Sequence, residues 1–539
     1  MRTSYDYIIV GGGSAGCVLA NRLSARSDLK VLLLEAGGEE KGLLHQAPAA
    51  FYKLFKTEAD WAFYTEPQEN LAGRELYWPR GKVLGGSSAI NAMIYIRGNP
   101  YDYDAWGQPG WGYREVLPYF RRMETHPLGP SEYHGDSGPL NVEVRRYTNL
   151  LSHAFVEAGV QAGLRRNDDF NGPHQEGVGL LHVTCKNGQR HSTYSAYLKP
   201  VLHRPNLTVL TGARVHRVLL ERTRATGVEV RYQGALHTLH AERGVILAAG
   251  AVQSPQLLML SGIGPADHLR RHGLEPRLDL PVGQNLWDHL ALPVIWRCKK
   301  PVSLDDAVPL GNVLRRETPR SVAEAQALVK NLPEAVRFAL THNGLLTSNI
   351  AEAGAFLRVL PGAPAPDLQF HFGPAYFANH GFTHPQGHYF TIGPTLVGSR
   401  SRGFIELKSA DPEAAPRIQP RYLSAEEDLE VLLRGLELAR EIAGQPAFDP
   451  YRGEEVHPGA TARTRGELEA YVRQNAQTLY HPAGTCSMGQ VVDERLKVLG
   501  AENLFVADAS VMPGVVRGNT NAPAIMIGEK AADLLLAQA

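Results

Sequence analysis

The stretch YDYIIVGGGSAGCVLANRLSA (5–25) sets a short apolar run directly before three glycines and a helical pattern. Residues 5–10 have the composition of a buried parallel strand. A second apolar run, KVLLLEAGG (30–38), follows the helical segment and contains Glu35. A strand, a glycine loop, a helix and a strand that ends in an acid form the dinucleotide fingerprint G-x-G-x-x-G in its expected context. The segment therefore predicts a Rossmann-like α/β domain.

Each residue of this loop has an expected role at the dinucleotide. Gly11 makes the tight turn, Gly13 lets the backbone approach a pyrophosphate, and Gly16 allows the helix to pack on the sheet. The N–H groups and the dipole at the helix N-terminus favour the phosphates. Glu35 is placed to accept hydrogen bonds from the adenosine ribose, and an acid there disfavours a 2′-phosphate. The adjoining residues of the expected site are Ser14, Ala15 and Ala36.

The same loop fits a second motif from a different class of enzyme. GGSAG (12–16) matches G-x-S-x-G, the nucleophile elbow of α/β-hydrolases, with Ser14 as the nucleophile. An elbow serine normally follows several strands of its sheet, whereas this one follows the first, and a hydrolase leaves Glu35 without a role. The hydrolase is kept as the alternative.

Composition limits the classes of function. The chain has 539 residues, too many for one compact core, so two or more domains are expected. Lys+Arg and Asp+Glu both count 55, which provides no net field for nucleic acid. The four cysteines are far apart, which argues against a disulfide framework or a zinc site and suits a reducing compartment.

The location of the protein is also an expectation from the sequence. The N-terminus enters a strand within a few residues, which leaves no room for a secretory signal. No apolar run approaches the length of a membrane helix. The expected location is the cytoplasm, and peripheral attachment to the inner membrane stays open.

Later segments bear on the choice between NAD and FAD. Residues 206–221 and 226–242 have the pattern of a β-meander, and 243–264 reads as a buried strand followed by a helix. ENLFVADASVMP (502–513) offers a late strand that ends at Asp508. This order resembles the flavoprotein version of the fold, in which the late Asp region, here Asp508 and Ala509, meets the ribityl-phosphate part of FAD.

Four motifs in this order resemble one family, the glucose–methanol–choline (GMC) oxidoreductases. They are RGKVLGGSSAINAMIYIRGNPYDYDAW (80–106), GAVQSPQLLMLSGIG (250–264), LYHPAGTCSMG (479–489) and GNTNAPAIMIGEK (518–530). The resemblance runs from residue 5 to about 532 and is strongest to the choline dehydrogenase and alcohol dehydrogenase branch. It implies FAD-dependent oxidation of a primary alcohol, choline-like or another small aliphatic or aromatic one, to the aldehyde.

The resemblance also assigns residues to the flavin. It implies that Val83, Gly86 and the stretch Asn91, Ala92, Met93 and Ile94 run along the pyrophosphate and the isoalloxazine. The backbone of Val215 is expected at the adenine, and Thr520 also belongs to the cofactor site. Some members carry a histidine that bonds covalently to the flavin, and Ile90 stands at that position here. An aliphatic side chain cannot form this bond, so FAD is expected to be noncovalent.

Alcohol oxidation needs a base for the hydroxyl proton and a donor for the growing alkoxide. A neutral imidazole is the natural base near neutral pH. The resemblance implies that His481 is this base and Asn521 the donor beside it. Pro482 biases His481 toward an extended backbone, which suits a side chain that is held into a cavity.

The expected architecture has two discontinuous domains. Residues 1–150, 205–310 and 460–539 are assigned to the FAD domain, and 151–204 and 311–459 to an α+β substrate domain on an antiparallel sheet. In the substrate domain, the segment 367–390 is rich in aromatic residues. Its residues Phe370, Phe372, Tyr376 and Phe377 are candidates for an apolar pocket, with plain core packing as the alternative. A choline head group requires aromatic faces and a carboxylate, and Glu352 is the acid nominated for it.

No metal site is expected. His380, His384 and His388 have helical metal spacing, but Gly381, Pro385 and Gly387 make a helix there implausible.

Several alternatives stay open within and beyond the family. The electron acceptor is oxygen, a quinone or another carrier, so an oxygen-using alcohol oxidase is the chief rival. A hydroxynitrile lyase and a flavin-binding protein without turnover are more distant alternatives.

Overall fold

The computed structural model describes residues 3–307 and 322–538. Its first sheet has the order β10-β2-β1-β13-β12-β11, and β23 pairs with β13. The pairs that β1, β2, β10, β13 and β23 form among themselves are parallel, whereas β11, β12 and β13 form an antiparallel meander. The strands are β1 (Ser4–Val10), β2 (Val31–Glu35), β10 (Leu207–Thr211), β11 (Arg214–Glu221), β12 (Arg224–Tyr232), β13 (Ala235–Leu247) and β23 (Leu504–Val506).

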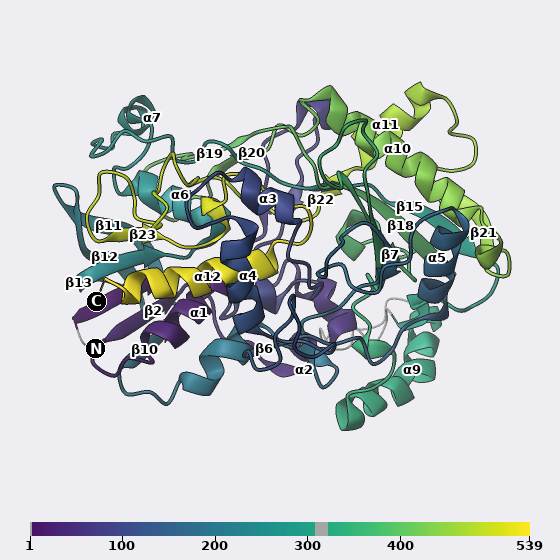
Figure 1. Ribbon diagram of the computed structural model, residues 1–539, viewed down its shortest axis with the longest axis horizontal. Helices are drawn as coiled ribbons and strands as arrows, with labels where there is room; N and C mark the ends of the chain where they lie inside the picture. Colours follow the sequence, from purple (N-terminus) through teal and green to yellow (C-terminus); the bar gives the residue numbers. More distant parts are fainter. Residues whose placement is uncertain (1–2, 308–321, 539) are drawn as a thin grey trace.

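Two helices lie side by side over this sheet (Figure 1). They are α1 (Ser14–Leu23) and α12 (Asn521–Leu536), which come from opposite ends of the chain. Arg22 of α1 forms an ion pair of 2.7 Å with the fully buried Glu529 of α12, and the Tyr197 hydroxyl donates to the same carboxylate. A third helix, α6 (Gly250–Leu260), packs against β11. The predicted Rossmann-like domain is therefore confirmed.

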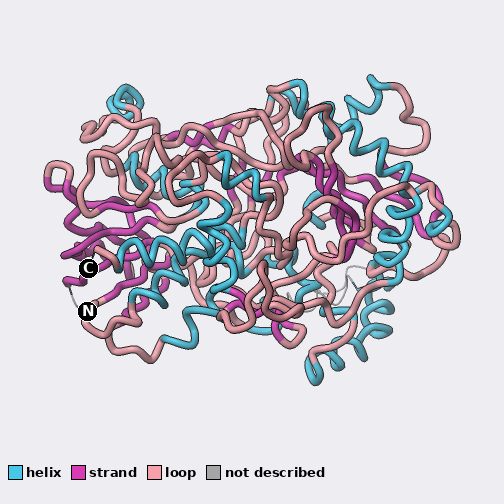
Figure 2. The backbone as a smooth tube through the Cα atoms, viewed as in Figure 1, coloured by secondary structure: helices cyan, strands magenta, loops and turns pink. Residues whose placement is uncertain are grey.

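The second sheet lies toward the opposite end of the molecule (Figure 2). Its order is β21-β15-β18-β17-β16-β7, with β14 pairing β18 and β22, and every pair is antiparallel. Helices α5 (Leu150–Gln161) and α10 (Glu426–Ala443) pack on it. The strands are β7 (Gly177–Leu180), β14 (Leu290–Ala291), β15 (Val294–Cys298), β16 (Ala353–Leu357), β17 (Leu368–Gly373), β18 (Tyr389–Leu396), β21 (Arg452–His457) and β22 (Gln477–Thr478). The predicted antiparallel sheet is confirmed.

The membership of this sheet differs from the predicted division of the chain. Strands β14, β15 and β22 fall within 205–310 and 460–539, the ranges expected for the FAD domain, yet they pair with strands of the second sheet. The chain thus crosses between the sheets more often than predicted. One such crossing ends in the segment that contains His481, so the second sheet positions that residue.

Within residues 3–307 and 322–538, no helix combines the length and the apolar character needed to cross a membrane.

Candidate active site

A cavity of about 320 Å³ lies between the two sheets. Its first-sheet part is formed by residues 10–11, 13–15 and 34–36, at the carboxyl ends of β1 and β2, together with parts of 248–257 and 508–509. Its second-sheet part includes 291–293 and segments of β17, β18 and 477–482. Ligands of open α/β sheets bind at the carboxyl ends of the strands, which is where this cavity lies.

The glycines of the first-sheet part bring two loops into backbone contact. A Cβ at Gly86 would lie 2.6 Å from Cα of Gly13, and one at Gly16 would lie 1.9 Å from the carbonyl oxygen of Gly11. Gly11 has φ +103°, a conformation that side chains rarely adopt. A Cβ at Gly13 would meet no protein atom closer than 3.8 Å, so a side chain there would occupy the cavity rather than clash. Gly13 therefore keeps space for a ligand.

Two helix N-termini meet at this part of the cavity. Ser14 begins α1 and Asn521 begins α12, and both residues line the cavity. The Ser14 hydroxyl donates to the carboxamide oxygen of Asn521 over 2.7 Å. Unpaired N–H groups at helix starts favour phosphates, so the arrangement suits a dinucleotide pyrophosphate. A serine nucleophile requires a base that takes its proton, and Ser14 instead donates to an amide, which contradicts the hydrolase alternative.

Two buried acids face the same region. Glu35 accepts the N–H groups of Gly12 and Gly37 at 2.9 and 2.8 Å, and burial raises its pKa to about 7. Carboxylate oxygens with lone pairs to spare suit ribose hydroxyls. Asp508 accepts the N–H of Gly250 and the hydroxyl of Ser254, and it thereby fixes the end of β23 against α6. The residues thus fit an FAD that lies along the first sheet.

Most of the predicted cofactor residues surround this cavity. Gly16 does not line it but packs α1 on the sheet, the role that the sequence predicted. Val83 does not line it either, and its side chain is buried in an apolar cluster with Phe51 and Ile90. The predicted residues that do line it are Gly11, Gly13, Ser14, Ala15, Glu35, Ala36, Gly86, Asn91, Ala92, Met93, Ile94, Val215, Asp508, Ala509 and Thr520.

His481 lines the second-sheet part and is only 8% exposed. Its backbone N–H donates to Asp288 over 2.8 Å. Its Nε2 lies 3.3 Å from the amide nitrogen of Asn519, and its Nδ1 lies 2.9 Å from Nδ1 of His289. An amide nitrogen only donates, so Nε2 of His481 accepts and the ring proton is assigned to Nδ1, from which it is donated to His289.

Burial keeps these imidazoles neutral. Burial, followed by the neighbouring His289 and His371, depresses the pKa of His481 well below 6.5. Burial also lowers the pKa of His289 to about 3 and that of His371 to about 4. At neutral pH, His481 therefore presents an unprotonated Nε2 at a buried cavity wall, as a general base requires.

The predicted amide partner of His481 is wrong by two residues. Asn521 is turned toward Ser14 at the start of α12, whereas Asn519, just before the helix, is the amide beside His481. The carboxamide oxygen of Asn519 accepts from Gln369 over 3.4 Å, which orients the amide nitrogen toward the imidazole. Residues 519 and 521 diverge because the helix begins between them.

Of the predicted substrate residues, Phe377 lines the cavity, whereas Glu352, Phe370, Phe372 and Tyr376 do not. Glu352 is fully buried and accepts hydrogen bonds from the N–H of Asn149 and the hydroxyls of Ser152 and Ser348. Its carboxylate therefore bonds to groups of the protein and does not face a substrate. Phe370 is buried in the core, and the Tyr376 hydroxyl lies 2.9 Å from Nε2 of His457.

The alternation of strand β17 explains the error for Phe370. Side chains on a strand point alternately to its two faces. Phe372, two residues after Phe370, stacks on Phe155 of α5 at 4.7 Å and marks the core face. His371 and Gly373 occupy the other face and line the cavity.

The aromatic wall of the cavity comes mainly from other segments. Phe51, Phe55, Phe377 and Tyr480 line it. The ring centroid of Phe51 lies 6.0 Å from that of Phe55 and 6.2 Å from that of Phe377. The ring centroid of Phe55 lies 5.7 Å from that of Tyr480. Only Phe377 belongs to the aromatic segment 367–390, and the residues before 60 carry no motif that points to a pocket.

The three histidines considered for a metal have separate partners. Nδ1 of His380 lies 2.7 Å from the Tyr480 hydroxyl, and Nδ1 of His388 lies 2.9 Å from the Ser303 hydroxyl. The ring of His384 packs 5.6 Å from that of Tyr52.

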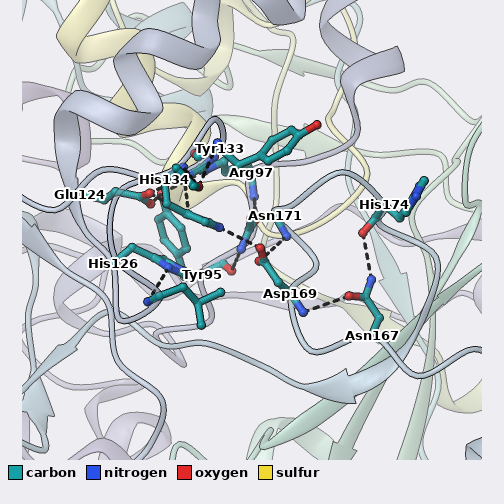
Figure 3. A network of polar contacts seen from close by, with 12 residues as sticks. Tyr95, Arg97, Glu124, His126, Tyr133, His134, Asn167, Asp169, Asn171 and His174 are labelled. Atoms are coloured by element: carbon teal, nitrogen blue, oxygen red, sulfur yellow. Dashed lines mark hydrogen bonds and ion pairs between the residues drawn. The ribbon is translucent and has the colours of Figure 1, made fainter.

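Figure 3 shows a different polar cluster, which the sequence did not indicate. None of the residues labelled there lines the cavity. The two ring nitrogens of His134 lie 2.9 Å from Glu124 and 2.8 Å from Asp169, and Arg97 pairs with Glu124 at 2.5 Å. Burial lowers the pKa of His134, but the hydrogen bonds to Asp169 and Glu124 outweigh it and raise that pKa. The ring of His126 stacks on His134 at 3.6 Å, so their lone pairs do not converge. We assign the cluster to ion pairing within the fold.

Comparison with known proteins agrees with this site. Two family models described as GMC oxidoreductase match residues 5–291 and 399–528. The chain is 42% identical to mouse choline dehydrogenase, mitochondrial, over 99% of this chain and 90% of the relative. It is 42% identical to oxygen-dependent choline dehydrogenase of Brucella suis over 98% of this chain and 95% of the relative.

Among solved structures, pyridoxine 4-oxidase from Mesorbium loti superimposes with a TM-score of 0.86 at 34% identity, covering 98% of both chains. Formate oxidase superimposes with a TM-score of 0.89 at 27% identity, covering 99% of this chain and 98% of the other. The motifs, the two-sheet fold and the matches agree along nearly the whole sequence. The chain therefore belongs to the GMC oxidoreductase family and is an FAD-dependent oxidoreductase that acts on CH–OH groups.

Proposed function

We propose that the protein oxidises a small primary alcohol to its aldehyde, with His481 as the base. The observation that carries the proposal is the unprotonated Nε2 of His481, which is buried at the cavity wall beside the amide of Asn519. When bound, FAD supplies the two-electron acceptor for the hydrogen on the alcohol carbon. The residues assigned to hold it are those of the two glycine loops, the two helix N-termini and Glu35.

The chain's own groups divide the remaining work. Nε2 of His481 takes the hydroxyl proton, and the amide N–H of Asn519 stabilises the negative charge that grows on the oxygen. His289 is a positioning residue, because its Nδ1 accepts from Nδ1 of His481 and so keeps the lone pair on the other nitrogen. His481 is only 8% exposed, and such burial strengthens these interactions.

The test is an anaerobic panel of primary alcohols, choline included, scored by bleaching of the yellow flavin. We expect at least one alcohol to reduce the flavin within a turnover time typical of enzymes. Reoxidation of the bleached protein with air or with a quinone then identifies the electron acceptor, which separates a dehydrogenase from an oxidase. A yellow protein that no alcohol bleaches would contradict the proposed function.

We propose further that FAD is held without a covalent bond. Ile90 lines the cavity, and its aliphatic side chain has no nucleophilic atom that could bond to the flavin. We expect acid precipitation to leave the yellow cofactor in the supernatant. A precipitate that retains the colour after washing would contradict this expectation.

A further inference from the structure

We propose that the preferred alcohol is uncharged and has a branched apolar or aromatic body, in contrast to a quaternary ammonium alcohol such as choline. The inference rests on the proposed function and narrows its substrate class. It follows from the charges of the second-sheet part of the cavity, where the alcohol would lie beside His481.

No carboxylate lines the second-sheet part, among the residues that the structure describes. The two acids on the cavity wall, Glu35 and Asp508, belong to the first-sheet part and accept hydrogen bonds from the backbone there. Asp288 lies behind His481, away from the wall, and accepts from the His481 N–H and from the Thr478 and Tyr422 hydroxyls. These acids are not available to a bound cation.

The charge that does lie near this part is positive. Arg80 lines the cavity, and its guanidinium, which has Asp288 and Asp60 as charged neighbours, donates to the carbonyl of Tyr480 over 2.5 Å. The other titratable groups on this wall are the imidazoles of His481 and His371 and the phenol of Tyr480. All three are neutral at pH 7, because burial lowers the pKa of the two imidazoles and raises the pKa of the phenol. Nε2 of His371 has no hydrogen-bond partner among the described residues, so it can bond to a hydroxyl without adding charge.

The rest of the wall is apolar. Phe51, Phe55, Phe377 and Tyr480 present rings, and Ile350 and Leu479 add aliphatic surface. Aromatic faces attract a cation, but this attraction offsets only part of the cost of removing an unpaired charge from water. For a neutral molecule of the same shape, burial against these side chains is favourable throughout. The wall therefore disfavours a charged substrate, but it does not disfavour a large one.

The decisive test uses a matched pair of alcohols. Choline and 3,3-dimethylbutan-1-ol have the same shape and differ in the charged nitrogen that replaces a carbon. We expect the neutral alcohol to reduce the flavin of the holoenzyme anaerobically with a kcat/KM at least about 100-fold higher than that of choline. The dissociation constants of the two alcohols can be measured from the flavin absorbance change in the slow His481→Ala holoprotein. The neutral alcohol should have the lower dissociation constant.

A pair of variants tests charge directly. Ala291, in strand β14, lines the cavity, so a longer side chain at this position would reach into it. We expect Ala291→Glu to reduce the preference for the neutral alcohol at least about tenfold, because it provides a counter-ion. Ala291→Gln, equal in size and uncharged, should leave the ratio of the two kcat/KM values unchanged.

The outcomes separate the two proposals. If neither alcohol nor any other member of the panel bleaches the flavin, the proposed function fails. If choline reduces the flavin as well as its neutral isostere or better, alcohol oxidation stands and the neutral-substrate inference is overturned. An unchanged preference in a folded Ala291→Glu holoenzyme would also overturn it.

Discussion

Replacing His481 by alanine slows anaerobic flavin reduction by an alcohol about 10²- to 10⁴-fold, the usual contribution of a general base. The expected loss is large because Nε2 of His481 is unprotonated at neutral pH, whereas the other imidazole on the second-sheet wall, His371, lies on a separate strand. FAD should stay bound, since its assigned contacts come from the first sheet and the two helix N-termini. Stopped-flow absorbance of the flavin measures the rate constant.

The matched control is His268→Ala. His268 is also a buried histidine, but it lies outside the cavity and accepts the backbone N–H of Leu407 over 3.0 Å. We expect this variant to reduce its flavin at nearly the wild-type rate, even if it is less stable. A His481→Ala protein that retains FAD and reduces it at the wild-type rate would remove His481 from the mechanism.

The cofactor part of the site could be predicted because its signals are local. The spacing of Gly11, Gly13 and Gly16 is read within one strand–loop–helix unit. Close backbone contacts require Gly11 and Gly16, and the space for a ligand requires Gly13. Glu35 follows at a fixed distance on the next strand of the same unit. Such short-range geometry does not depend on how the rest of the chain folds.

The substrate part could not be predicted because strand pairing decides which face of a strand is core. The aromatic content of 367–390 drew attention to Phe370, but β17 turns that residue toward the core and His371 toward the cavity. Glu352 has the appearance of an isolated acid in the sequence, yet it accepts from Asn149 and Ser152 of a distant segment and from the nearby Ser348. The local sequence around Phe370 and Glu352 does not indicate that either side chain points away from the cavity.

His289 was missed for the same reason. It is one of 21 histidines, and WDHLALP carries no local signal that sets it apart. The pairing of β14 with β22 aligns Leu290 with Thr478, and the Leu479 N–H donates to the His289 carbonyl over 2.9 Å. This long-range register, and not the sequence around either residue, brings His289 against His481.

The amide was located to the correct motif but to the wrong asparagine. GNTNAPA (518–524) contains Asn519 and Asn521, and a family pattern read without the helix boundary does not distinguish them. Thr520 is the residue that precedes the first helical turn, with Pro523 inside that turn. A helix that starts at residue 521 turns that side chain toward its neighbour α1 and leaves residue 519 on the approach to the cavity.

Substitutions at the two asparagines should therefore have different effects. Asn519→Ala removes the amide N–H that lies 3.3 Å from Nε2 of His481. We expect it to slow flavin reduction about 10²- to 10³-fold, as the loss of a donor to a developing oxyanion does, while FAD stays bound. Asn521→Ala removes the acceptor of the Ser14 hydroxyl at the helix N-termini. We expect it to weaken FAD retention while the flavin that remains is reduced within a few-fold of the wild-type rate.

Two measurements on each variant distinguish these effects. The ratio of flavin to protein absorbance reports retention of the cofactor, and single-turnover reduction reports the chemistry of the fraction that holds it. The comparison is internal, because both substitutions shorten the same side chain to alanine two residues apart. If Asn521→Ala kept its FAD and lost the rate while Asn519→Ala kept both, the amide that stabilises the alkoxide would be Asn521. The 3.3 Å contact of Asn519 with His481 would then hold the imidazole in place without taking part in the reaction.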